Sequence, residues 1–215
     1  GINSLVTAAK LGKTGKKVVV FEARDHIGGL ADTSEFANGF TCNMLNDQVD
    51  GIDPRLEKEF DLLSHGLKMS QPDPIRIALD KDGNHIRFYQ DVQKTTKSIN
   101  IHSEKDAAKW SEFNTHILRL TEFLKTIYQS PPPDLPKIGF SDLARLKSLF
   151  KPLMKQGTTG LAEFMRTLPM MMPELMDEWF ESDLLRGAIS AQTVKDLSQG
   201  PYASATVLNL LHRHI

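Results

Sequence analysis

The stretch that decides the fold is GINSLVTAAKLGKTGKKVVVFEARDHIGG, residues 1–29. Apolar residues at helical spacing predict a helix from Leu5 to Lys13, and Gly12 and Gly15 suit its end. Residues 18–21 are a short, continuous and largely β-branched run, which is typical of a strand buried on both faces of a parallel sheet. This order predicts the turn, first helix, second strand and following loop of a dinucleotide-binding βαβ unit, entered one strand late.

The chemistry of a dinucleotide explains the residue types in this stretch. A pyrophosphate needs backbone N–H groups at a helix N-terminus with no side chain in the way, and Gly1 stands just before the predicted helix. Ser4 occupies the place of the last glycine in the usual fingerprint. Glu22 follows the predicted strand about 20 positions after Gly1, where a carboxylate accepts hydrogen bonds from ribose hydroxyls. Its negative charge disfavours the 2′-phosphate of an NADP-type nucleotide.

Residues 1–40 resemble the FAD-binding signature of the amine oxidase and phytoene desaturase superfamily. In that signature a glycine-rich turn, a strand-end Glu, an Ala-Arg pair and a Gly-Gly loop recur in this order. There are two departures: the first glycine and the whole first strand are absent, and Leu30 stands where many relatives carry Arg. The matching residues are Gly1, Ser4, Leu5, Ala8, Leu11, Gly15, Val18, Val20, Glu22, Ala23, Arg24, Gly28, Gly29, Thr33, Gly39 and Phe40.

This resemblance implies an FAD site and a role for each matching residue. Gly1, Asn3 and Ser4 would line the pyrophosphate, and Glu22 would hold the adenosine ribose. The pair Ala23-Arg24 would stand beside the adenosine portion. The flavin side of the pyrophosphate would be approached by Gly28, Gly29 and Leu30.

The resemblance continues more loosely at residues 65–67, 177–182 and 210–212. These segments are similar to landmarks of the phytoene desaturase-like branch that includes the pyridine nucleotide-disulfide oxidoreductase domain-containing protein 2 group, where they lie in the first half of a longer chain. Disulfide chemistry needs a cysteine pair, and this chain has only Cys42. The branch implies an apolar, often isoprenoid, small-molecule substrate.

Composition excludes several classes of protein. The 215 residues are 40% hydrophobic and 25% charged, as in an ordinary globular protein. The net charge of −1 and the scattered Lys and Arg residues exclude a nucleic-acid partner. No apolar run reaches the roughly 20 residues that span a bilayer. Peripheral membrane contact, an oligomeric state, and a cytoplasmic or membrane-associated location are left open.

The sequence pattern changes at residues 71–74, which contain two prolines. We therefore expect a partial FAD-binding domain at 1–70, lacking its first strand, and a partial substrate domain at 71–215. Residues 30–50 read as loop and short strand with a turn at Asn38-Gly39. The expected fold class is α/β: a partial Rossmann-type FAD-binding domain followed by an α-rich substrate domain with a β-hairpin.

Individual elements are predicted from periodicity and capping residues. An amphipathic helix is expected over 55–65, and alternation around a Lys-Asp-Gly-Asn turn predicts a hairpin of 75–79 with 86–89. A serine followed three residues later by an aspartate opens a helix over 103–128. Another helix is expected from Ser141.

The sequence gives weaker signals for a functional role at other positions. The Met-rich stretch of 154–176 suits the wall of an apolar cavity, but core packing or an interface is favoured. Trp179 and Phe180 are expected to be core anchors. His26 is near the predicted cofactor loop, yet a solvated loop side chain is the simpler interpretation. No metal ligand set, catalytic acid or catalytic base is assigned.

Three functions remain open from the sequence. The favoured one is an FAD-dependent oxidoreductase of the desaturase or dehydrogenase type, which takes hydride from an apolar substrate. The second is a truncated, inactive remnant or partner-binding fragment of such an enzyme. The third is an NAD-binding dehydrogenase domain, in which Gly28-Gly29 would be incidental.

Overall fold

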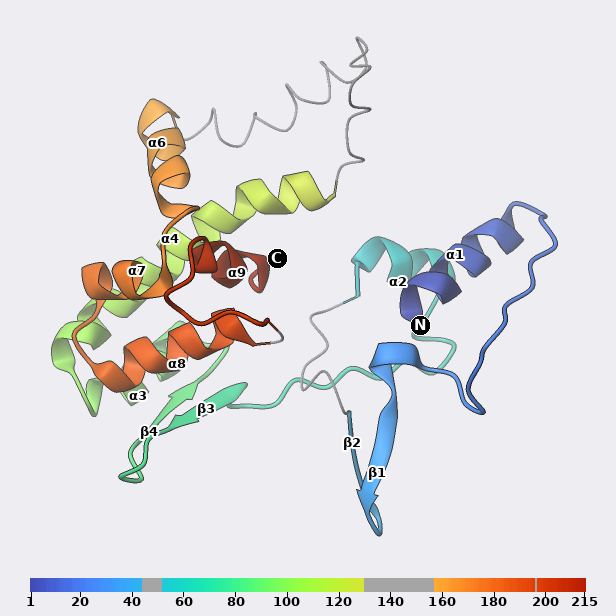
Figure 1. The fold of residues 1–215 in the computed structure, drawn as a ribbon, viewed down its shortest axis with the longest axis horizontal. Coiled ribbons are helices and arrows are strands. Elements are labelled where there is room, and N and C mark those ends of the chain that lie inside the picture. Colours follow the sequence, from blue (N-terminus) through green and yellow to red (C-terminus); the bar gives the residue numbers. More distant parts are fainter. Residues whose placement is uncertain (44–51, 130–156, 196) are drawn as a thin grey trace. The chain divides into compact units, whose positions relative to one another are not determined.

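The computed structural model describes residues 1–43, 52–129, 157–195 and 197–215. It divides into two units, Gly1–Lys68 and Met69–Ile215 (Figure 1). The first unit carries helices and a small hairpin, and the second is mostly helical with another hairpin. The mixed α/β class is therefore confirmed. The helix expected from Ser141, and residues 44–50 of the stretch expected to be loop and short strand, lie outside the described residues.

The first helix of the chain confirms the predicted glycine-to-helix turn. Helix α1 spans Ile2–Lys13, so it begins directly after Gly1, three residues before the predicted start at Leu5, and it ends at Thr14. Gly15 then takes a φ of 78°, and the N–H of Lys16 donates to the carbonyl of Leu11 at 3.2 Å. A left-handed glycine after the last turn is the usual way to satisfy the final carbonyls of a helix.

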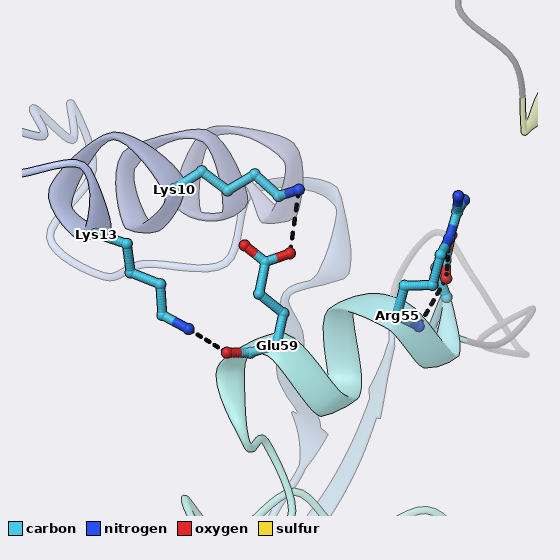
Figure 2. Close-up of polar contacts among 5 residues, drawn as sticks. Lys10, Lys13, Arg55 and Glu59 are labelled. Atoms are coloured by element: carbon cyan, nitrogen blue, oxygen red, sulfur yellow. Dashed lines mark hydrogen bonds and ion pairs between the residues drawn. The ribbon is translucent and has the colours of Figure 1, made fainter.

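Helix α2, Pro54–Phe60, is shorter than the predicted helix over 55–65. It ends early because Asp61 adopts a left-handed φ of 49° and the N–H of Leu62 closes on the carbonyl of Glu57. Figure 2 shows how α2 is joined to α1: Lys10 forms an ion pair with the Glu59 carboxylate at 3.2 Å, and Lys13 donates to the Glu59 carbonyl. These contacts join the end of α1 to α2.

The predicted buried strand at residues 18–21 is wrong. No strand is assigned there, and the side chains of Val19 and Phe21 are 73% and 92% exposed. A strand exists only through hydrogen bonds to a neighbour, and no segment in the described ranges pairs with residues 18–21. Among the described residues, pairing occurs only in two antiparallel hairpins, so the expected parallel sheet is not seen.

The first hairpin confirms the short strand and turn expected after residue 30. Strand β1, Thr33–Ala37, pairs with β2, Phe40–Asn43, around a turn in which Gly39 has a φ of 79°. A single 3-10 turn, η1 at Gly29–Ala31, precedes it. The hairpin thus begins directly beside the Gly28-Gly29 doublet.

The second unit opens with the predicted hairpin, β3 at Arg76–Leu79 and β4 at His85–Phe88. Helix α3, Val92–Asn100, was not predicted; its signal is Asp91, whose carboxylate accepts from the backbone N–H groups of residues 93 and 94. The predicted helix after Ser103 is confirmed as α4, Glu104–Tyr128, with the Ser103 hydroxyl as its cap. Helix α3 packs on both α4 and β4.

Four further helices complete the described part of the second unit: α6 at Gly157–Thr167, α7 at Met172–Trp179, α8 at Asp183–Val194 and α9 at Thr206–His212. Their apolar faces meet α4 in one core. The side chains of Met172, Met176 and Phe180 are buried there, so these methionines fill the core rather than line a cavity. None of the described helices is both long enough and apolar enough to cross a membrane.

Candidate functional site

The two predicted glycine loops meet in the first unit. Gly29 has a φ of 66°, and a side-chain carbon at that position would lie 2.8 Å from the Cα of Gly1 and 3.2 Å from its nitrogen. Contacts as short as the first do not occur for real side chains, so only glycine fits. The chain thus brings residues 28 apart in sequence into direct backbone contact at the start of α1.

This contact lies where a helix offers unpaired donors. The first N–H groups of α1 have no partner within the helix, and no side chain caps them. Asn3 and Ser4 lie in this first turn, and the Asn3 carbonyl accepts from the Thr7 hydroxyl at 2.9 Å. A helix N-terminus bordered by bare glycine backbone suits a phosphate group, because anions are favoured there and no side chain blocks the approach.

Glu22 is held by its own backbone turn rather than by the end of a strand. Its Oε1 accepts hydrogen bonds from the N–H groups of Ala23 at 2.9 Å and Arg24 at 3.2 Å. These bonds, led by that from Arg24, lower the pKa of Glu22. The carboxylate is therefore ionised and oriented, and Oε2 makes no hydrogen bond to any residue in the described ranges.

A group of four charged side chains borders the glycine doublet; we call Arg24, Asp25, His26 and Asp32 the charged loop cluster. The imidazole of His26 lies between two carboxylates, with Nδ1 2.5 Å from Asp25 Oδ1 and Nε2 2.8 Å from Asp32 Oδ2. The guanidinium of Arg24 is 3.9 Å from Asp32. Sequence reasoning noticed His26 but missed both aspartates, for which the only signal was their place beside the glycines.

Asp32 also packs on the doublet itself. A side-chain carbon at Gly28 would lie 3.2 Å from the Cα of Asp32 and 3.3 Å from its Oδ1. Leu30 falls within η1 with an exposed side chain. The structure therefore brings Gly1 to Gly29 and Gly28 to Asp32, and the binding roles of all the predicted residues stay predictions.

The second unit contains a separate polar hollow of about 680 Å³ along α4. At its wall the buried His116 accepts at Nδ1 from Arg119 at 3.1 Å, and its ring lies 5.3 Å from that of Trp179. Burial lowers the pKa of His116, which keeps the ring neutral. Arg119 is also paired with Glu163. Within the described ranges no group of His, Cys, Asp and Glu could hold a metal ion.

Comparison with known proteins identifies the class of the first unit. Residues 1–58 match the family described as NAD(P)-binding Rossmann-like domain. The matched residues include the Gly1–Gly29 contact, Glu22 and the charged loop cluster. The dinucleotide-binding expectation is thereby confirmed at the level of this domain family, which suits a flavin or nicotinamide dinucleotide.

The whole chain is homologous to larger proteins. It is 28% identical over 225 aligned positions to pyridine nucleotide-disulfide oxidoreductase domain-containing protein 2 of Rattus norvegicus, and equally to that of Mus musculus. In both cases the match covers 99% of this chain and 39% of the relative. A limonene dehydrogenase subunit of Castellaniella defragrans is 34% identical over 113 residues, 52% of this chain and 20% of that protein. No solved structure matches.

These matches confirm the resemblance to the pyridine nucleotide-disulfide oxidoreductase domain-containing protein 2 group. The chain spans about two fifths of the length of the first two relatives. The alignment runs through both units, so the second unit is also shared with those relatives.

Proposed function

We propose that this chain carries the FAD-binding segment and part of the substrate domain of an oxidoreductase that removes hydride from an apolar, isoprenoid-like substrate. The observation that carries the proposal is the backbone contact of Gly29 with Gly1 at the start of α1. In an NAD site the Gly28-Gly29 doublet would be incidental. Its φ values of 146° and 66° and its position against Gly1 favour a second loop that is shaped to approach a longer cofactor.

The structure supports an assignment of roles to the residues of the first unit. Gly1, Asn3 and Ser4 would bind the pyrophosphate through backbone and first-turn groups. The ionised Glu22 would accept hydrogen bonds from the adenosine ribose, with Ala23-Arg24 beside the adenosine.

The rest of the cofactor would pass Gly28, Gly29 and Leu30. These positions present backbone and no charge at the doublet itself, which suits close passage of a large ring system. The flavin, when bound, supplies the chemistry by accepting hydride from a substrate carbon.

The substrate class is proposed from the relatives. One relative is named for dehydrogenation of limonene, which is an apolar terpene. The same class was expected from the family resemblance. A cofactor that carries the redox chemistry leaves the protein to bind and orient such a molecule, so no catalytic acid or base needs to be assigned in the described residues.

The test is a comparison of dinucleotides on the intact protein made from its complete gene. Apoprotein is titrated with FAD, NAD and NADP by calorimetry, for the wild type and for Glu22→Ala. We expect FAD to bind tightest and Glu22→Ala to weaken it by about tenfold, the low end of what one hydrogen bond to a charged group contributes. Tighter binding of NAD than of FAD would refute the FAD proposal while keeping the dinucleotide site.

A further inference from the structure

The imidazole of His26 is the only group in the charged loop cluster that contacts both aspartates. Its two nitrogens lie 2.5 Å from Asp25 Oδ1 and 2.8 Å from Asp32 Oδ2. An ionised carboxylate only accepts hydrogen bonds, so satisfying both contacts requires a hydrogen on each ring nitrogen. The geometry therefore fits imidazolium and does not fit the neutral ring.

The carboxylate at one end of this bridge is built into the glycine loop. Asp32 packs against Gly28, and the N–H of Ala31 donates to the Gly28 carbonyl at 3.3 Å. The segment from His26 to Asp32 is thus a ring closed by one side-chain bond, with the glycine doublet inside it. Asp32 therefore lies beside Gly28, and the next residue, Gly29, is the one that touches Gly1.

We propose that His26 is a positioning residue, which in its protonated form closes the loop from Asp25 to Asp32 and so holds Gly28-Gly29 against Gly1 in the shape that receives a dinucleotide. The loop-closing role stands on the geometry alone. The link to cofactor affinity rests on the proposed function.

The charges around His26, like the geometry, favour cofactor binding when His26 is protonated. The groups that face His26 are the carboxylates of Asp25 and Asp32, and Arg24 is the cation on Asp32. With protonated His26 the cluster has two positive and two negative groups. When His26 loses its proton, the cluster gains a net negative charge next to the place proposed for a pyrophosphate, which would weaken anion binding.

The direction of the pH dependence follows from these contacts. The hydrogen bond to Asp25, and next that to Asp32, raises the pKa of His26 above the usual 6.5. A base with a raised pKa in the folded loop contributes stability that is complete below the unfolded value and is lost as pH rises through the folded value. The loop is therefore ordered in mild acid and loosens as the pH rises above about 6.5 and through the raised pKa of His26. His26 is half exposed, so the effect is limited to about fivefold.

Hydrogen exchange on the intact protein tests the loop-closing role without any cofactor. Exchange of the peptide covering residues 23–33 is followed by mass spectrometry from about pH 5.5 to about pH 8.5 and corrected for the intrinsic pH dependence of amide exchange. We expect wild-type protection to fall about fivefold across this range. His26→Gln, which cannot be protonated there, should show low and constant protection, and His26→Arg should show high and constant protection.

His65→Gln is the matched control, because His65 is another exposed histidine of the first unit, bonded through Nδ1 to the Asp61 carbonyl. It should reproduce the wild-type profile. A wild-type profile that is flat, or a His26→Gln profile that still titrates, would overturn the proposal.

The link to the cofactor is measured separately, as the FAD dissociation constant of the same variants over the same pH range. We expect it to rise about fivefold in the wild type and to stay constant in His26→Gln. Loop protection that titrates while FAD affinity does not would overturn the link. If no FAD binds at any pH but loop protection titrates as expected, the proposed function fails and the loop-closing role of His26 is supported.

Discussion

Replacing Gly29 with alanine tests the backbone contact that carries the proposed function. The new Cβ would lie 2.8 Å from the Cα of Gly1, whereas ordinary van der Waals contact begins at 3.4 Å, so the two loops must separate by about 0.6 Å. That displacement is large compared with the tolerance of hydrogen bonds from backbone N–H groups to a phosphate. Bonds of this charge-assisted kind contribute about 1.5–3 kcal/mol each. Losing one corresponds to at least a tenfold loss of dinucleotide affinity.

Gly39→Ala is the matched control for this change. Gly39 also has a positive φ, 79°, and a Cβ there would meet nothing within 4 Å. Both variants carry the cost of a left-handed alanine, about 1 kcal/mol, but only Gly29→Ala pushes on Gly1. The assay is FAD titration of the intact apoprotein by flavin fluorescence, together with the melting temperature of each variant. Equal affinity of the two variants, within about twofold, would refute the reasoning from the Gly1–Gly29 contact.

Three further predictions concern the second unit. Asp106→Ala should lower the free energy of unfolding by about 3 kcal/mol, because the buried carboxylate accepts from two backbone N–H groups that would lose their partner. Denaturant unfolding measures this free energy. A loss below about 1 kcal/mol would contradict the prediction. Burial lowers the pKa of His116, so the wild type should lose stability as the pH falls below about 6.5, and this loss should be smaller in His116→Gln. Denaturant unfolding at several pH values measures the free energy of unfolding of both proteins. Parallel curves of this free energy against pH would contradict the prediction. Arg76→Met should raise the melting temperature, since burial lowers the pKa of Arg76 to about 10, and Nε and Nη1 are buried without a hydrogen-bond partner in the described part of the chain. A lower melting temperature would show that its contact with the Phe88 ring contributes more than burial costs.

The elements that local chemistry determines were predictable from the sequence. Helix α4 is capped by Ser103 and reaches Tyr128 as expected, because a hydroxyl cap and a long apolar stripe specify it without reference to other segments. The hairpin of β3 and β4 was equally predictable from its turn residues. Helix α1 was predictable from the glycine before it, its apolar face and the glycines at its end.

The errors arose where structure depends on distant partners or on small conformational choices. Residues 18–21 have the composition of a buried strand, yet a strand forms only against a neighbour, and the described residues provide none. Helix α2 stops at Phe60 because a single aspartate adopts a left-handed conformation, for which residue type gave no clear signal. Helix α3 was missed although Asp91 is an ordinary cap.

The candidate site was partly predictable. The types and order of Gly1, Glu22, Gly28 and Gly29 indicated a dinucleotide. Their contact could not be read from spacing, because it depends on the φ angles of the doublet. The bridge from His26 to Asp32 likewise depends on the path of the loop.

The most direct test of the central claim is to identify and quantify the small molecule released on denaturing the intact protein purified from its own gene, alongside its visible spectrum. The account predicts a flavin spectrum and FAD released in roughly a 1:1 ratio to protein, with less FAD retained by Gly29→Ala than by Gly39→Ala. Protein that carries no flavin, and whose spectrum and melting temperature do not change when FAD is added, would contradict it.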